Sequence, residues 1–239
     1  MTQILLSLDL YVLVWRYKGP GSASSPQSQP PPSARSLQLL HLVTMCTGKC
    51  AKCIGFSLFP FSIISIIANL FLLFPGWELE AVENAAEQLT PEVLYLGGVI
   101  GGGILVLVPA IHIQATGRKG CCNNRCGMFL SILFAAIGLV GSGYGFIVAI
   151  FAMIRGPTCL TLSGAWGRPF YTNLTEFDDK NYLFEKELWV QCVSPKDVVV
   201  FNITLFSMIL ASSGISLILC TIQVVNGLIG TICGTCGKK

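Results

Sequence analysis

Four long, nearly uncharged apolar runs constrain this chain more than any other feature. They are Ile54–Phe74, Val93–Ile113, Met128–Ile154 and roughly Val199–Val225. Each run is long enough to cross a hydrocarbon core of about 30 Å as a helix, which takes roughly 20 residues. The sequence therefore predicts an all-α membrane protein, with a bundle of four transmembrane helices in residues 45–239.

Charge is scarce in this chain. Of the 239 residues, 11% are charged and 53% are hydrophobic, whereas a soluble domain is about 25% charged. A net charge of +3 is too small to indicate nucleic-acid binding. The four spans leave little chain for an independent soluble domain.

The first 44 residues have a different composition. Gly19–Arg35 is rich in Pro, Ser and Gly, and such a segment cannot bury enough apolar surface to fold. We expect residues 1–44 to be a disordered extension, or not to be made at all, with translation starting at Met45. The alternative is a proline-rich ligand at Pro30–Pro32, since such runs favour an extended left-handed helix.

Basic residues beside the spans predict the orientation, because they are retained on the cytoplasmic side. They precede span one, separate spans two and three, and follow span four: Lys49, Lys52, Arg118, Lys119, Arg125, Lys238 and Lys239. The connection between spans one and two holds only acidic charges. We therefore expect both termini in the cytoplasm and the large loop, about Arg155–Val198, outside the cell or in a lumen.

Two glycosylation sequons fall on the predicted outer side, at Asn173 and Asn202. Asn173 lies in the middle of the large loop and is the better acceptor. Asn202 lies at the mouth of span four, where the alternative is a polar residue at a helix start.

Two of the eleven cysteines, Cys159 and Cys192, lie in the large loop. An isolated pair on an oxidising face predicts a disulfide, which would stabilise a loop of this length by about 3–4 kcal/mol. Free thiols are the alternative.

Eight other cysteines lie at the predicted inner face: Cys46, Cys50, Cys53, Cys121, Cys122, Cys126, Cys233 and Cys236. Cytoplasmic cysteines beside a membrane are typical acceptors for palmitoylation, and this position explains all the clusters at once. The alternative is zinc, because two Cys-x-x-Cys pairs have ligand spacing. A lumenal thiol oxidoreductase is excluded, since both pairs face the cytosol. Cys220 lies inside span four and is expected to pack there.

Small and polar residues inside the spans predict close helix packing. Glycines four apart let helix backbones approach, and amides inside a bundle can hydrogen-bond between helices. The predicted packing residues are Asn69, Gly97, Gly98, Gly101, Gly102, Gly141, Gly145, Gln223 and Asn226. Homo-oligomerisation is the alternative use of the glycines. No span centre carries a charge, which argues against ion-coupled transport.

Several motifs resemble one family of four-span proteins. They include Met45-Cys-Thr-Gly-Lys-Cys-Ala-Lys-Cys53, Gly156-Pro-Thr-Cys-Leu160 and Cys220-Thr-Ile-Gln-Val-Val-Asn-Gly-Leu-Ile-Gly230. From Met45 onward the chain resembles the transmembrane-4 L-six family, which is tetraspanin-like. It departs from that family at Phe201, where a Trp is usual. Its inner loop at residues 121–126 is also shorter, with fewer cysteines, so a full set of acylation sites is not implied.

The resemblance implies a non-enzymatic organiser in the plasma membrane or an endolysosomal membrane. Such proteins associate laterally with integrins, tetraspanins or receptors, and affect adhesion, migration and growth signalling. Aromatic residues of the large loop, including Trp166, Phe170 and Trp189, are the recognition candidates. The alternative for these aromatics is the loop's own small core.

A sensor or carrier of a lipid or small molecule is the second functional hypothesis. Such a protein would use the outer loop or a cavity between helices. An enzyme is not expected, because the only histidines are His41 and His112 and no catalytic constellation is evident. We expect no cofactor, no metal and no nucleic acid, and we expect membrane lipids to surround the bundle.

Overall fold

The computed structural model describes residues 32–75, 88–116, 125–171 and 181–233. Within these ranges it describes the side chains of residues 51–75, 88–115, 129–171, 181–229 and 231. The chain divides into two compact units, Met1–Leu42 and Val43–Lys239. The second unit contains all four apolar runs.

Four helical segments of the described residues are long and apolar enough to cross a membrane. They are Ala51–Leu72, Pro91–Ala115, Phe129–Arg155 and Val198–Ile229. Each overlaps one of the four apolar runs, so the prediction of a four-helix membrane bundle is confirmed.

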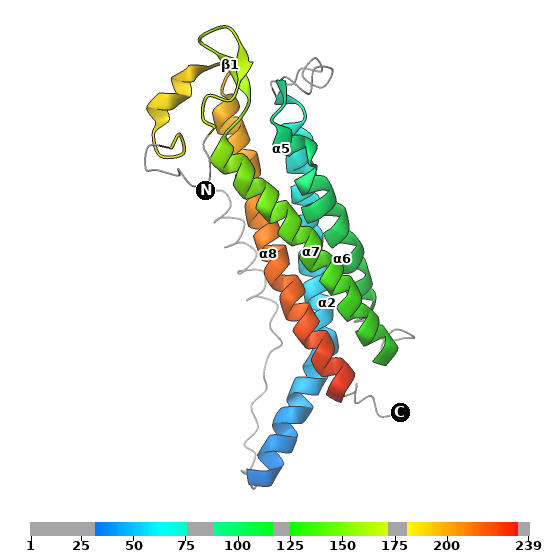
Figure 1. Cartoon of the computed structure of the whole chain (residues 1–239). Helices are drawn as coiled ribbons and strands as arrows, with labels where there is room; N and C mark the ends of the chain where they lie inside the picture. Colours follow the sequence, from blue (N-terminus) through cyan, green and yellow to red (C-terminus); the bar gives the residue numbers. More distant parts are fainter. Residues whose placement is uncertain (1–31, 76–87, 117–124, 172–180, 234–239) are drawn as a thin grey trace. The chain divides into compact units, whose positions relative to one another are not determined.

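Three of the spans lie in uninterrupted helices, which Figure 1 labels α2 (Pro32–Leu72), α7 (Arg125–Arg155) and α8 (Val198–Cys233). Helix α2 begins well before the predicted start of span one, so residues 32–44 of the predicted extension are helical. Residues 1–31 lie outside the described part of the chain. Whether the extension belongs to the protein stays a prediction.

The second span is broken into three pieces, unlike the single helix expected over residues 93–113. They are α5 (Pro91–Leu94), the π-helix η2 (Gly97–Ile104) and α6 (Leu105–Thr116). The break falls at Leu96, whose φ of 49° is left-handed. The glycine-rich sequence after Leu96 gives the backbone freedom for this change of geometry.

The amide of Asn69 on α2 compensates for part of this break. Its Oδ1 accepts a hydrogen bond of 3.2 Å from the backbone N–H of Val99, in the first turn of η2. First-turn N–H groups have no partner within their own helix. Since a lipid-embedded segment has no water to satisfy them, Asn69 supplies the partner that the π-helix lacks.

The glycines of η2 lie against three neighbouring helices. A Cβ atom at Gly101 would lie 2.7 Å from the carbonyl oxygen of Gly141 and 2.8 Å from the nitrogen of Gly145, both on α7. One at Gly102 would overlap Ser65 Oγ on α2 and lie 2.7 Å from Ser213 Oγ on α8. The glycine-lined face of the broken span therefore lies close to three helices, α2, α7 and α8.

Three further predicted packing residues, Gly97, Gly98 and Gln223, also lie at contacts between helices, whereas the hydrogen bond of Asn226 to Gln223 is within α8. A Cβ at Gly97 would lie 2.9 Å from Val148 of α7, and one at Gly98 would lie 2.6 Å from the Asn69 side chain. Farther along the bundle, Gln223 Nε2 donates a 2.7 Å hydrogen bond to Ser131 Oγ. Asn226 in turn donates to Gln223 Oε1 at 3.4 Å.

Helices α7 and α8 pack along each other, as Figure 1 shows for the green and orange-red ribbons. Two buried apolar clusters fill the bundle. One lies toward the large loop and contains Ala68, Leu72, Leu89, Val93, Ala149, Ala152, Leu205, Phe206 and Ile209. The other contains Ala51, Ile54, Leu58, Val106, Ala110, Ile113, Ala135 and Cys220. The lone cysteine of span four therefore packs in the core, as expected.

The loop between α7 and α8 carries a small antiparallel sheet that was not expected from the sequence. Its strands are β1 (Cys159–Thr161), β2 (Trp166–Gly167) and β3 (Cys192–Ser194), in the order β2-β1-β3. Cys159 pairs with Gly167, and Thr161 pairs with Cys192. A 3₁₀-helix, η4 (Lys186–Gln191), leads into β3. The fold remains mostly helical.

Candidate functional site

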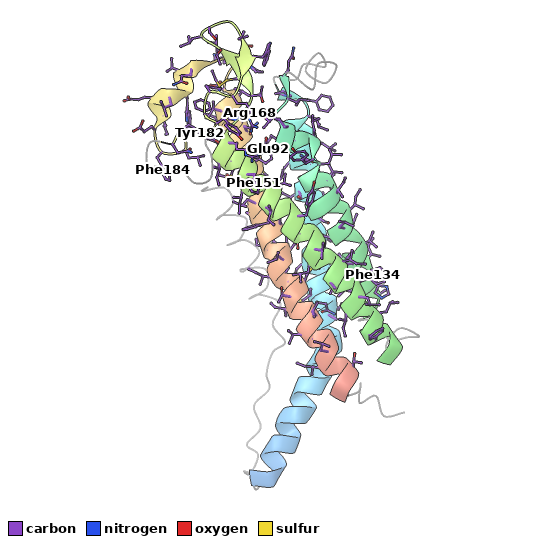
Figure 2. All side chains as sticks on the ribbon, viewed as in Figure 1. Glu92, Phe134, Phe151, Arg168, Tyr182 and Phe184 are labelled. Carbon is purple, nitrogen blue, oxygen red and sulfur yellow. A yellow bond between two sulfur atoms is a disulfide. The ribbon has the colours of Figure 1, made fainter. Side chains whose placement is uncertain are left out.

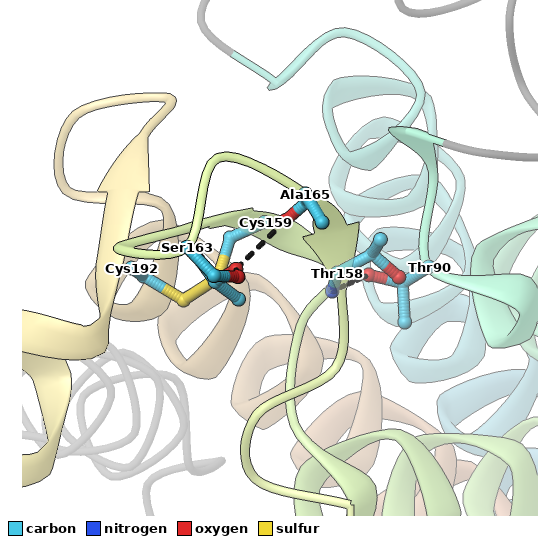
Figure 3. The surroundings of a disulfide bond; sticks show 7 residues. Thr90, Thr158, Cys159, Ser163, Ala165 and Cys192 are labelled. Atoms are coloured by element: carbon cyan, nitrogen blue, oxygen red, sulfur yellow. Dashed lines mark hydrogen bonds between the residues drawn. A yellow bond between two sulfur atoms is a disulfide. The ribbon is translucent and has the colours of Figure 1, made fainter.

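A disulfide closes the large loop. Cys159 on β1 and Cys192 on β3 are bonded, with their Cα atoms 5.5 Å apart and a sequence separation of 33. Figure 3 shows the bond joining the two strands. The predicted disulfide is confirmed, and it fixes the edge of the sheet that leads back to α8.

Beneath the sheet, the loop has its own core. Phe170 and Tyr182 stack with ring centroids 4.7 Å apart, and they are buried with Cys159, Val198 and Val199. The Tyr182 hydroxyl donates a hydrogen bond to the carbonyl oxygen of Met153 on α7. Burial raises the pKa of Tyr182 above its ordinary value; the nearby Arg168 lowers it by a smaller amount. The loop core is thus joined directly to the end of α7.

A buried carboxylate holds the loop against the bundle. Glu92 on α5 has a side chain only 2% exposed; its Oε2 lies 2.8 Å from Arg168 Nη2 and its Oε1 3.3 Å from Arg155 Nη1. Arg168 lies in the loop just after β2, and Arg155 ends α7. Arg168 also donates a 3.0 Å hydrogen bond to the carbonyl oxygen of Gly156. We call these three residues, Glu92, Arg155 and Arg168, the Glu92 clamp; Figure 2 labels Glu92 and Arg168.

A second contact lies next to the clamp. The backbone N–H of Thr158 donates to Thr90 Oγ1 at 3.2 Å, and the Thr158 hydroxyl donates to the carbonyl oxygen of Leu89 at 3.4 Å. Figure 3 shows Thr158 and Thr90 beside the start of β1. The segment leading into α5 therefore contacts the large loop through both charged and neutral hydrogen bonds.

Comparison with known proteins decides the family. The family model described as L6 membrane protein matches residues 45–237. The mouse protein called Transmembrane 4 L6 family member 4 is 44% identical over 200 residues, covering 80% of this chain and 94% of that protein. This chain belongs to the L6 membrane protein family.

Other L6 relatives show comparable similarity. Human Transmembrane 4 L6 family member 1 is 42% identical over 201 residues, covering 80% of this chain and 96% of that protein. Human Transmembrane 4 L6 family member 5 is 41% identical over 200 residues, covering 82% of this chain and 98% of that protein. No solved structure matches the chain. The four helices and the family together establish a multi-pass, tetraspanin-like membrane protein.

The recognition candidates of this L6 protein occupy different positions. Phe170 is only 6% exposed and belongs to the loop's core rather than to a free surface. Trp166 and Trp189 are half-buried, and the indole N–H of Trp189 donates to the carbonyl oxygen of Tyr182 at 2.8 Å. For Phe170 and Trp189, the structure therefore favours the alternative of a structural role.

The exposed apolar side chains of the loop are mostly ones that sequence reasoning missed. Leu162, Phe184, Val190 and Val193 are 71%, 66%, 70% and 53% exposed. Of these, Phe184 alone is aromatic, the residue class that the sequence predicts for recognition. Of the other three, only Val193 lies in a strand, whereas Leu162 follows β1 and Val190 lies in η4. No strand alternation in the sequence could therefore identify them.

Sequence reasoning also missed the Glu92 clamp in this L6 protein. From the sequence, Glu92 is one of the acidic residues of the connection between spans one and two, and Arg155 is only the first residue of the large loop. One signal could have pointed to it: opposite charges stand at adjacent ends of spans two and three. Such charges at the membrane boundary are expected to pair rather than to remain isolated.

The predicted modification sites lie largely outside the described residues. The described residues do not include Asn173, Cys121, Cys122 and Cys236. The described side chains do not include those of Cys46, Cys50, Cys126 and Cys233. Cys53 is an exposed free thiol, consistent with an acceptor. Asn202 is only 6% exposed, which favours a polar residue at a helix start over a glycan site. Among the described residues no three His, Cys, Asp or Glu side chains come together as a metal site.

Proposed function

We propose that this L6 protein is a non-enzymatic membrane organiser whose large loop recognises lateral partners. The observation that carries the proposal is the construction of the loop. It is a disulfide-linked lobe with its own core, and the Glu92 clamp holds it against the helices. A lobe held in this way presents a constant surface, which lowers the entropy cost of binding.

The proposed contact surface consists of the exposed apolar residues Leu162, Phe184, Val190 and Val193. Apolar and aromatic side chains are enriched at the centres of protein interfaces, where charged residues are depleted. The partners we propose are integrins, tetraspanins and receptors, with effects on adhesion, migration and growth signalling. The L6 relatives are named only as family members, so this partner class is a proposal for the present chain.

We also propose a location and orientation. The large loop faces the cell exterior or an organelle lumen, and both termini face the cytoplasm, because basic residues flank the spans on the opposite side. The membrane is the plasma membrane or an endolysosomal membrane. Palmitoylation of the inner cysteines, with Cys53 exposed among them, would anchor that side more firmly.

Affinity capture of the full chain tests the proposed role of the loop. The protein would be captured from cells in a mild detergent, and integrin subunits and tetraspanins in the eluate would be quantified. Leu162→Ser/Val190→Ser removes apolar surface without touching the loop core, and we expect it to reduce recovery severalfold. Cys159→Ser/Cys192→Ser should do the same by loosening the lobe.

The matched control is Glu187→Gln, which changes an exposed residue of the same loop. It should recover partners as the wild type does. If both loop variants retain the full set of integrins and tetraspanins at wild-type levels, the loop is not the recognition surface. Acyl-exchange labelling tests the inner cysteines separately, and complete absence of thioesters would redirect attention to zinc.

A further inference from the structure

A cavity of about 300 Å³ lies where α5 and its following turn meet α7. Its lining residues are Glu92, Tyr95, Tyr144, Val148, Phe151 and Arg155. Ligand pockets in proteins range from about 300 to 1,000 Å³. The cavity is therefore large enough for part of a ligand, such as a headgroup and the start of a chain.

The lining changes from charged to apolar along α7. Arg155 is the last residue of span three, and Tyr144 lies three turns earlier, about 16 Å along the helix axis. Tyr95 and Tyr144 are 54% and 42% exposed on the outer surface of the bundle, which faces lipid in a membrane. A charged end at the membrane boundary and an apolar end below it match the polarity of a membrane amphiphile.

The charges at the polar end favour an anion. The Glu92 clamp combines two guanidinium groups with one carboxylate, a net charge of +1. Arg155 has a side chain 33% exposed, and its one hydrogen bond within the described residues is the 3.3 Å contact with Glu92. A guanidinium has five N–H donors, so most of those on Arg155 remain for a ligand.

Two further features shape the cavity. The Tyr144 hydroxyl donates a 2.9 Å hydrogen bond to the carbonyl oxygen of Tyr95, which links α7 to the turn after α5. The guanidinium of Arg155 lies 5.1 Å from the centroid of the Phe151 ring. These contacts hold the cationic end and the apolar wall in fixed relation.

We propose that this cavity binds a phospholipid of the leaflet that adjoins the large loop. The phosphate accepts hydrogen bonds from Arg155, for which guanidinium geometry is well suited. The upper part of one acyl chain lies along Val148 and Phe151. The lipid-binding hypothesis thereby gains a location and a ligand class, and neither depends on the proposed lateral partners.

Native mass spectrometry of the purified full chain tests the site. Phosphatidylglycerol, phosphatidylcholine and diacylglycerol with identical acyl chains would be offered at equal concentration. Phosphatidylglycerol should be retained most, and diacylglycerol, which lacks phosphate, least. Because hydrogen bonds between charged groups are the strong ones, Arg155→Gln should reduce phosphatidylglycerol retention about tenfold or more.

Two further variants make the result unambiguous. Phe151→Trp adds bulk to the cavity wall while leaving the Glu92 clamp in place, and it should lower retention of both phospholipids. Lys196→Gln removes an exposed charge of the large loop and should leave retention unchanged. Equal retention of diacylglycerol and phosphatidylglycerol by the wild type would overturn the proposal. Retention of phosphatidylglycerol at the wild-type level by both Arg155→Gln and Phe151→Trp would also overturn the proposal.

Discussion

The guanidinium of Arg168 lies 2.8 Å from the carboxylate of Glu92, although their sequence separation is 76. The contact joins the start of the second span to the large loop between the third and fourth. A buried carboxylate is costly unless it is paired and hydrogen-bonded. We infer that the pair serves to fix the position of the loop rather than to maximise stability.

The two arginines of the Glu92 clamp should contribute unequally. Arg168 is the more buried, at 17% side-chain exposure against 33% for Arg155, and its contact with Glu92 is the shorter. Removing one partner of a buried pair costs about 3–5 kcal/mol, whereas exposed pairs contribute about 1 kcal/mol or less. Unfolding in detergent should show a loss of about 3 kcal/mol for Arg168→Gln and about 1 kcal/mol for Arg155→Gln. An equal or larger effect of Arg155→Gln would contradict this ranking.

The disulfide should protect the large loop from proteolysis. In the chain-entropy model, closing a loop of 33 residues contributes about 4 kcal/mol. Limited proteolysis should therefore cleave Cys159→Ser/Cys192→Ser within the loop much faster than wild type. Adding reductant should sensitise the wild type and have no further effect on the double variant. If wild type and the double variant resist cleavage equally, both with and without reductant, the disulfide is not needed to protect the loop.

Two glycines provide a matched test of helix approach. A Cβ at Gly101 would lie within 3 Å of backbone atoms of Gly141 and Gly145, whereas one at Gly143 would meet only Leu217 at 3.5 Å. Overpacking typically costs about 1–3 kcal/mol, so Gly101→Ala should lower thermal stability. Gly143→Ala should be neutral or stabilising, since Ala is the better helix former by about 1 kcal/mol. Similar melting temperatures for both variants would contradict this difference in packing.

Tyr182 should remain protonated at alkaline pH. Because burial raises its pKa above the usual value near 10, it stabilises the fold fully below about pH 10. That stabilisation is lost as the pH rises toward the folded-state pKa. In the folded protein, phenolate absorbance between pH 9 and 11 should be the same for Tyr182→Phe and wild type. Lower phenolate absorbance in Tyr182→Phe than in wild type over this range would contradict the prediction.

The spans and the disulfide could be predicted from the sequence because each depends on a local or compartmental rule. Hydropathy over about 20 residues identifies a spanning helix wherever its neighbours lie. Two cysteines on an oxidising face form a disulfide with each other when neither has another cysteine to pair with there. Neither prediction needs knowledge of which helices touch.

The break at Leu96 and the Glu92 clamp depend on tertiary contacts that a single sequence does not display. The π-helix is tolerated because Asn69, thirty residues away, supplies a hydrogen bond to Val99. Glu92 is buried only because Arg168 reaches it from the loop. The strands of the loop sheet have two or three residues, too few for a periodic pattern.

Hydrogen–deuterium exchange tests most directly the claim that Glu92 holds the large loop on the helix bundle. Amide exchange would be compared for residues 158–170 and 181–194 in wild type, Glu92→Gln and the exposed control Glu187→Gln. A loss of about 1.4 kcal/mol in local stability accelerates exchange about tenfold. We expect at least that acceleration in both segments for Glu92→Gln and none for Glu187→Gln. Wild-type exchange rates in Glu92→Gln would contradict the claim.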